Sequence, residues 1–153
     1  MMNRRTFTLA ALAGAVAPAA LRAESFEVTR TDAEWRAMLS DLQYQVMRQE
    51  ATERAGTSPL DKNYTAGVYQ CRGCALSLYD SSTKFDSGTG WPSFFQSLPN
   101  AIGTKDDRKL FSVRTEAHCR RCGSHLGHIF DDGPEPTGIR HCLNGASLVF
   151  VAA

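Results

Sequence analysis

The sequence has no large excess of charge of either sign, since its 153 residues include 17 Lys and Arg against 16 Asp and Glu. A basic arm for nucleic acid and an acidic tail are therefore excluded. It has no repeat of the solenoid kind. It also lacks the His-Glu-x-x-His motif of metalloproteases and the His-x-Glu with Pro-Cys-x-x-Cys of zinc deaminases, which disfavours those two chemistries. Because 42% of the residues are apolar, the chain can form a core, and its length predicts one folded domain.

Long apolar runs are also missing, except at the N-terminus, where residues 1–23 have the plan of a secretory signal peptide. Arg4 and Arg5 precede an uncharged, Ala-rich segment from Thr6 to Leu21, which is short for a membrane span. We therefore expect export to the periplasm and no stable membrane insertion. The paired arginines favour the twin-arginine route, and an ordinary Sec signal or an uncleaved anchor are the alternatives.

Removal of this segment takes away three arginines and no acidic residue, which leaves 14 basic and 16 acidic residues. Residues 24–153 then carry a small negative charge, which provides no attraction for DNA, RNA or an anionic membrane. We expect no nucleic-acid partner.

The remaining chain begins with a helical segment. Thr31 and Glu34 have the spacing of a capping box, and Ser40 can begin a second short helix that carries Val46 and Met47. Apolar residues at helical spacing, which we expect to pack in the core, are Trp35, Met38, Leu39 and Leu42.

From residue 64 onward, short β-like runs alternate with stretches rich in Gly, Pro, Asn and Asp. Strands are predicted over residues 67–70, 109–114 and 146–151. The pattern predicts one mainly β domain over residues 24–153, with a helical flap at its N-terminal end.

Two Cys-x-x-Cys motifs carry four of the five cysteines, namely Cys71, Cys74, Cys119 and Cys122. Two residues between the thiols let both sulfurs of a pair face one point, and two pairs complete the Cys₄ shell that structural zinc prefers. Gly73 and Gly123 suit the tight turns of such knuckles. The 44 residues between the pairs indicate an inserted subdomain.

These four cysteines can also serve in two ways that do not involve a metal. An exported protein can form disulfides, and a single Cys-x-x-Cys can be a redox pair of the thioredoxin kind. The duplicated spacing favours zinc.

Cys142 has no cysteine near it in the sequence. An unpaired cysteine in an exported protein is either an inert core residue or a reactive thiol. The neighbouring Arg140 can stabilise a thiolate and lower its pKa, and Asn144 can point to the same side of a strand. These neighbours favour the reactive thiol.

His125 and His128 follow the second knuckle. They can be structural histidines or alternative zinc ligands, but four cysteines already complete a zinc shell. Ligation is therefore the less favoured role.

At these residues the chain resembles the peptide-methionine (R)-S-oxide reductases, the B class of methionine sulfoxide reductases. The matching blocks are residues 84–94, 119–130 and 138–148, and with the two knuckles they extend over most of residues 32–151. The resemblance implies two antiparallel sheets in a small barrel-like domain with short N-terminal helices. It also implies a structural Zn²⁺ ion away from the active site.

The resemblance implies reduction of the R epimer of methionine sulfoxide, preferentially in oxidised proteins or peptides, by a chain expected to be monomeric. Cys142 matches the nucleophile and is left as a sulfenic acid. His125 and His128 match proton donors, and Trp91 matches an apolar wall for the substrate methyl group. The residues that match the rest of the surrounding site are Arg140, Asn144 and, on the acidic side, Asp132.

One position departs from the family pattern. Many members carry a resolving cysteine where this chain has Thr89. Since the other four cysteines are assigned to zinc, we expect an external thioredoxin-like or glutaredoxin-like thiol to reduce the Cys142 sulfenic acid.

Two functions of other classes compete with this one. The knuckles can belong to a non-catalytic zinc-binding module that recognises protein or nucleic acid, in which Cys142 and Trp91 are core residues. Alternatively, one Cys-x-x-Cys can carry out disulfide exchange, which zinc binding would preclude.

Overall fold

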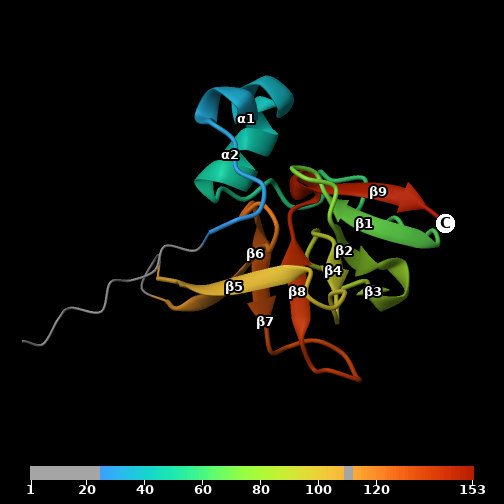
Figure 1. Cartoon of the computed structure of the whole chain (residues 1–153). Helices are drawn as coiled ribbons and strands as arrows, with labels where there is room; N and C mark the ends of the chain where they lie inside the picture. The colour runs from blue at the N-terminus through green and yellow to red at the C-terminus, as the bar shows by residue number, and fades with distance from the viewer. Residues whose placement is uncertain (1–24, 109–111) are drawn as a thin grey trace, which may run out of the picture.

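The computed structural model describes residues 25–108 and 112–153, and in it two short helices sit above a pair of β-sheets (Figure 1). The predicted signal segment, residues 1–23, lies outside the described residues. In the part of the chain that is described, no helix is long and apolar enough to cross a membrane.

Both N-terminal helices begin at capping boxes. At the start of α1 (Asp32–Met38), the Thr31 hydroxyl accepts the Glu34 N–H, and the Glu34 carboxylate accepts the Thr31 N–H at 2.7 Å. This confirms the predicted box. A second box, formed by Ser40 and Gln43, begins α2 (Asp41–Gln49). Each box satisfies backbone donors that would otherwise lack a partner in the first turn.

Only part of the predicted apolar stripe faces the core. Trp35 and Leu39 are buried, but Met38 and Leu42 are 44% and 50% exposed. The prediction for these two residues was wrong. For Leu42 the reason is that the backbone is extended at Leu39, so helical spacing does not continue from α1 into α2. α2 has its own buried face, which includes Met47.

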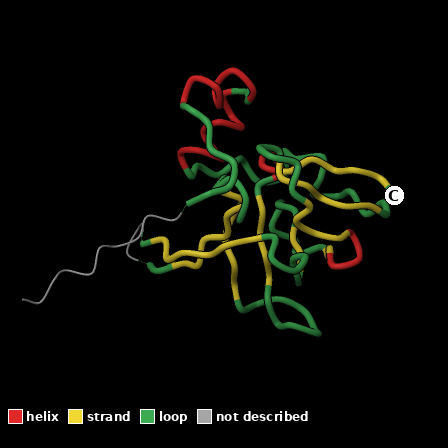
Figure 2. The backbone as a smooth tube through the Cα atoms, viewed as in Figure 1, coloured by secondary structure: helices red, strands yellow, loops and turns green. Residues whose placement is uncertain are grey.

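The strands form two antiparallel sheets, as the resemblance implied (Figure 2). The smaller sheet has the order β2-β1-β9, and the larger sheet has the order β3-β4-β8-β7-β6-β5. The strands are β1 (Gly67–Cys71), β2 (Ser77–Asp80), β3 (Lys84–Phe85), β4 (Ser93–Phe94), β5 (Ile102–Asp107), β6 (Arg114–Cys119), β7 (His125–Phe130), β8 (Arg140–Leu143) and β9 (Leu148–Ala152). Short 3₁₀ turns precede β3 and β9, at Ser81–Thr83 and Gly145–Ser147.

The three strands predicted from the sequence agree with the structure to different degrees. β1 lies where it was expected, and β9 begins two residues later because a 3₁₀ turn occupies 145–147. Of the strand predicted over 109–114, only Arg114 is in β6, and residues 109–111 lie outside the described part.

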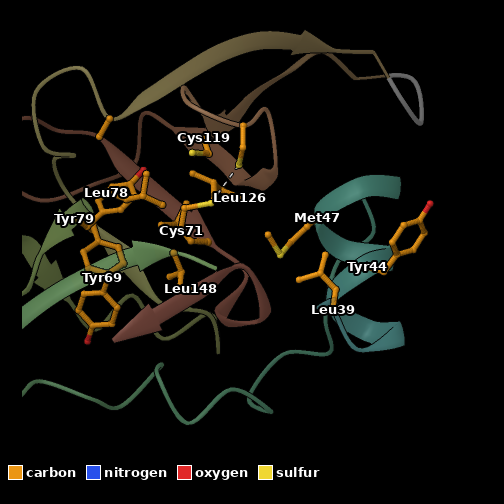
Figure 3. Close-up of a cluster of buried hydrophobic side chains, with 14 of the residues drawn as sticks. Leu39, Tyr44, Met47, Tyr69, Cys71, Leu78, Tyr79, Cys119, Leu126 and Leu148 are labelled. Atoms are coloured by element: carbon orange, nitrogen blue, oxygen red, sulfur yellow. Dashed lines mark hydrogen bonds between the residues drawn. The ribbon is translucent and has the colours of Figure 1, made fainter. Parts of the chain in front are cut away.

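A single cluster of buried side chains joins the helices to both sheets. Figure 3 shows Met47 of α2 directed toward Cys71 of β1 and Leu126 of β7. Leu148 of β9 and Phe94 of β4 are also fully buried in this cluster. Close packing on this side holds the central strands of the larger sheet, β7 and β8, in a fixed register.

Candidate active site

The larger sheet pairs two of the predicted site residues directly. Cys142 of β8 lies opposite His128 of β7 in the antiparallel register. The Cys142 side chain is half-buried and lines a cleft of about 130 Å³. The cleft is lined by Thr52, Trp91, Arg114, Gly127, His128, Phe130, Cys142, Leu143 and Asn144. Four predicted site residues, Cys142, His128, Trp91 and Asn144, thus meet at one cavity.

Burial raises the pKa of the Cys142 thiol above its usual value. The hydroxyl of Thr89 and the positive charge of Arg140 act in the opposite direction. The net effect differs from the expectation that Arg140 would lower this pKa, because desolvation of the thiolate outweighs the charge. Formation of the Cys142 thiolate near neutral pH therefore needs a proton acceptor in the cleft.

Hydroxyl groups form a chain beside Cys142. Thr89 Oγ1 lies 3.9 Å from Cys142 Sγ and 2.8 Å from Ser87 Oγ, which lies 2.7 Å from Ser93 Oγ. Ser93 donates its proton to the Trp91 carbonyl, so Ser87 donates to Ser93. The Thr89 hydroxyl can then donate its proton either to Ser87 Oγ or to Cys142 Sγ. A negative charge on the sulfur favours donation to Cys142.

His128 is held by a buried carboxylate. Its Nε2 lies 2.8 Å from Asp107 Oδ2, and the same oxygen accepts from Arg114 Nη2 at 2.7 Å. Burial lowers the pKa of His128, whereas the hydrogen bond to Asp107 raises it. The ring is therefore neutral near pH 7. With Nε2–H donated to Asp107, Nδ1 is the nitrogen free to accept a proton.

His125 does not line the cleft. It is fully buried behind His128, with the two ring centroids 5.4 Å apart. Its Nδ1 lies 3.0 Å from Glu116 Oε1, and Glu116 Oε2 lies 3.2 Å from Lys105 Nζ. Burial by itself would raise the pKa of Glu116, but its pairing with His125 lowers it. His125 thus packs edge-on against the His128 ring and is not part of the cleft wall.

Arg140 and Asp132 form a pair beside the cleft. Asp132 accepts two hydrogen bonds from Arg140, both at 2.8 Å. The hydrogen bonds from Arg140 lower the pKa of Asp132. The guanidinium also lies 4.4 Å above the Phe130 ring. Arg140 and Asp132 line a neighbouring polar hollow together with Thr89, and Asp132 does not line the cleft. The two hydrogen bonds from Arg140 mean that Asp132 fixes the orientation of the guanidinium.

Glu53, which is buried, ties Trp91 to Asn144. The Trp91 indole N–H donates to the Glu53 carbonyl at 3.1 Å, and the Glu53 N–H donates to Asn144 Oδ1 at 3.0 Å. Its carboxylate accepts the backbone N–H groups of Gly145 and Ala146. Asn144 Nδ2 in turn donates to the Leu126 carbonyl. Asn144 is therefore buried and fixed, and it shapes one wall of the cleft.

The four cysteines of the two knuckles form a possible metal site, as the spacing predicted. The Sγ atoms of Cys71, Cys74, Cys119 and Cys122 all lie within 4.8 Å of one another. The pairs Cys71–Cys122 and Cys74–Cys119 are 3.6 and 3.5 Å apart. A disulfide requires about 2.05 Å, so the disulfide alternative does not apply. None of the four lines the cleft.

The two knuckles have the same backbone hydrogen bonds. Ala75 N–H donates to the Cys71 carbonyl, and Gly123 N–H donates to the Cys119 carbonyl, each at 2.8 Å. Gly123 has a φ of +67°, as expected for a glycine there, but the equivalent residue in the first knuckle is Ala75, with a φ of +58°. The expectation for Gly73 was thus misplaced by two residues. At Gly73 a Cβ would instead approach Trp35 to 3.1 Å.

Sequence reasoning missed three buried carboxylates of this site, Asp107, Glu116 and Glu53. Glu116 lies in β6, beyond the end of the strand that the sequence predicted there, so its burial can be recognised only once β6 is known. Asp107 and Glu53 lie more than 30 residues from Cys142 in the sequence, and no local motif marks them.

The fold and the cleft together define a β-sheet thiol protein with a separate four-cysteine cluster. The SelR domain model matches residues 39–152. A peptide methionine sulfoxide reductase MsrB from Thiobacillus denitrificans is 51% identical over 127 residues, covering 82% of this chain and 96% of its own. The protein of the same name from Methylibium petroleiphilum is 53% identical over 125 residues, which cover 81% of this chain and 91% of that protein. A third protein of this name, from Leptospira interrogans, is 46% identical over 127 residues, which cover 82% of this chain and 97% of that protein.

The chain belongs to the SelR family, the family that its sequence blocks resemble. The blocks at 84–94, 119–130 and 138–148 all lie within the matched residues.

Proposed function

We propose that this chain reduces the R epimer of methionine sulfoxide to methionine, acting on oxidised proteins and peptides. The observation that carries the proposal is the half-buried Cys142 thiol paired across the sheet with His128 in a small cleft of a SelR chain. The names of the relatives support the same activity.

The reaction begins at Cys142. His128, which is neutral near pH 7, accepts the thiol proton, and Asp107 stabilises the resulting imidazolium. The thiolate attacks the sulfoxide sulfur and forms a sulfur–sulfur bond, and the imidazolium returns the proton to the sulfoxide oxygen, which leaves as hydroxide when the sulfur–oxygen bond breaks. The hydroxide then attacks the Cys142 sulfur, and the sulfur–sulfur bond breaks with its electron pair going to the methionine sulfur. The products are methionine and a sulfenic acid on Cys142, so the sulfur of the substrate is reduced and that of Cys142 is oxidised.

Trp91 gives the cleft its asymmetry. Its indole N–H is bonded to the Glu53 carbonyl, which fixes the ring as an apolar wall. The substrate methyl group packs on this wall while the oxygen turns toward His128. In the S epimer these two groups are exchanged, which would place the oxygen on the indole.

The sulfenic acid is recycled by an external thiol of the thioredoxin or glutaredoxin class. Two thiols supply two electrons, water leaves, and an external disulfide forms. Beside Cys142 lies the Thr89 hydroxyl, and the other four cysteines lie in the separate cluster. After one turnover without reductant, dimedone should label Cys142 in the wild type. In Thr89→Cys an internal disulfide should form instead, because the Thr89 hydroxyl and the Cys142 sulfur are neighbours. An internal Cys142 disulfide in the wild type would contradict external recycling.

The four-cysteine cluster fits zinc. A tetrahedral site with Zn–S bonds of about 2.3 Å has S–S separations of about 3.8 Å, close to the 3.5 and 3.6 Å observed. Cys71 lies at the end of β1 and Cys119 at the end of β6. A bound ion would therefore crosslink the two sheets and stabilise the fold.

Metal content by mass spectrometry should give one zinc per chain. Cys74→Ser should lose zinc and lower the Tm, whereas Cys142→Ser, the matched control, should retain both. Zinc-free wild-type protein with an unchanged Tm would contradict a structural metal.

The decisive test of the activity uses separated R and S epimers of a blocked methionine sulfoxide with dithiothreitol. Wild type should consume the R epimer only, and Cys142→Ser should consume neither. If zinc-loaded wild type has no turnover, the non-catalytic zinc module is the better description.

For residues 1–23, we propose a cleaved export signal that delivers the enzyme to the periplasm. The support is the basic, apolar and small-residue plan of this segment. Mass spectrometry of periplasmic protein should show an N-terminus near residue 24, and a retained Met1 would contradict cleavage.

A further inference from the structure

We propose that a hollow with an aliphatic patch, next to the Cys142 cleft, binds an apolar side chain that flanks the methionine sulfoxide in a peptide substrate. This inference rests on the proposed function and adds a sequence preference to it. We call this surface the flanking hollow; it is lined by Val113, Arg114, Thr115, Ile129, Phe130, Asp131 and Ile139.

The flanking hollow lies at one end of the larger sheet. There β6 begins at Arg114, β7 ends at Phe130, and β8 begins directly after Ile139. Its volume is about 480 Å³. Arg114 and Phe130 line both this hollow and the catalytic cleft, so the two share a wall.

The size of the cleft makes a second contact surface necessary. Its volume of about 130 Å³ is slightly smaller than a 150 Å³ cavity that holds benzene. It can take the reacting side chain, but the rest of a peptide must lie on the adjoining surface. The flanking hollow is the larger space next to it and has room for a neighbouring side chain.

The chemistry of the hollow favours an apolar occupant. Val113 is 62% exposed, the largest exposed fraction among the exposed large hydrophobic residues in the described part of the chain. Ile129 and Ile139 line the same surface and are half-buried. The charge of Arg114 is already paired with Asp107 at 2.7 Å. Thr115 and the exposed Asp131 also line the hollow, and Val113, Ile129 and Ile139 supply its aliphatic surface. A bound Leu or Val would remove this surface from water.

The surface on the other side of Cys142 is different. The hollow that contains Thr89 is lined by Asp86, Asp132 and Arg140 among others, so it is polar and charged. Of these two hollows, the flanking hollow is the one lined by several aliphatic side chains, Val113, Ile129 and Ile139. This contrast assigns the apolar neighbour of the sulfoxide to the Val113 side.

The test compares three substrates that share the same reacting group. They are blocked methionine-(R)-sulfoxide, the peptide Ser-Leu-Met(R-sulfoxide)-Leu-Ser, and the peptide in which both leucines are replaced by serine. Wild type should reduce the Leu peptide with about tenfold higher kcat/KM than the Ser peptide, mainly through KM. Val113→Ser should lower this ratio about threefold, and Val113→Asp should lower it further.

Two controls make the result specific. Val113 does not line the cleft, so its variants should reduce the blocked amino acid as wild type does. Val151→Ser removes a valine that is 44% exposed on β9, in the other sheet, and should leave all three substrates unchanged. Equal kcat/KM for both peptides, or a preference that survives Val113→Asp, would overturn the inference. Failure of the proposed function would instead appear as no turnover of the blocked amino acid.

Discussion

Thr89 Oγ1 lies 3.9 Å from Cys142 Sγ, and it is the last hydroxyl of a chain that passes through Ser87 to Ser93. Burial raises the pKa of Cys142, and the Thr89 hydroxyl opposes that effect most strongly. A side chain that carries no thiol thus lies beside Cys142, and its hydroxyl favours the thiolate form of that residue.

Replacing Thr89 by Val should raise the pKa of Cys142 further, because the shape is kept but the donor is lost. At pH 8 the rate of Cys142 alkylation by iodoacetamide, followed by peptide mass spectrometry, should fall about threefold to tenfold. Thr89→Ser keeps the hydroxyl and should remain near the wild-type rate. An unchanged rate in Thr89→Val would show that this hydroxyl does not stabilise the thiolate.

Asp107→Asn should weaken the hold on His128, since the shared acceptor of His128 and Arg114 loses its charge. The pKa of His128 should fall further, because Asp107 raises it in the wild type. We expect kcat/KM to fall about tenfold or more, and the acidic limb of its pH profile to shift to lower pH.

The adjacent Asp106 provides the matched control. It is exposed and pairs with exposed Arg108, so Asp106→Asn should keep both the rate and the pH profile. If Asp107→Asn lost stability but kept the wild-type pH profile, its role would be structural only.

Ala75→Gly should stabilise the first knuckle. Ala75 has a φ of +58°, in the left-handed region that costs a residue with a Cβ about 1 kcal/mol or more. Glycine avoids this cost but adds entropy to the unfolded chain, so the free energy of unfolding should rise by only about 0.5 kcal/mol.

The reciprocal change, Gly123→Ala, should destabilise the protein, since φ is +67° there and a Cβ would clash with the Phe26 ring. Urea unfolding at equal metal content measures both variants. A loss of stability in Ala75→Gly would contradict the strain at this residue.

His141 should make the fold less stable in mild acid. Its Nδ1 lies 3.0 Å from the hydroxyl of buried Tyr79, and burial lowers the pKa of His141 to about 4. The unfolded chain, with an ordinary pKa of about 6.5, binds a proton at higher pH than the folded chain. The free energy of unfolding is therefore unaffected by His141 above about pH 6.5. It decreases as the pH falls from 6.5 toward 4, because the unfolded chain gains a proton that the folded chain does not.

Between pH 7 and pH 5 the expected loss from His141 is about 2 kcal/mol. Urea unfolding at both pH values should show a smaller difference in His141→Asn than in wild type. An equal difference in the two proteins would place the pH dependence at other groups.

Local patterns were enough to predict several features of this protein. The Thr31 capping box depends on residues three apart, and each Cys-x-x-Cys knuckle depends on one turn of backbone, so neighbours in the sequence decide both. Joining the two knuckles into one cluster required only the chemical preference of four thiols for one ion. Cys142 was recognisable because it was the cysteine left over, and the family resemblance then gave its role as nucleophile.

Long-range packing decided the rest. Met38 and Leu42 fit the helical pattern, yet both are exposed; Leu42 falls out of the pattern because the backbone is extended at Leu39. His125 and His128 look equivalent in the sequence, but only His128 reaches the cleft, since His125 is buried against Glu116.

By itself, then, the sequence determined the mainly β class of fold and the four-cysteine cluster, and it singled out Cys142 as the cysteine left over, because these depend on local spacing, residue chemistry and the blocks that resemble a known family. Only the tertiary structure decided the pKa of Cys142, the partner of His128 and the surface next to the cleft. Each of these depends on burial, and on residues distant in the sequence, such as Asp107, which the fold places against His128, and Val113, which lies in the hollow next to the cleft. Desolvation and long-range contacts have no signature in the local sequence.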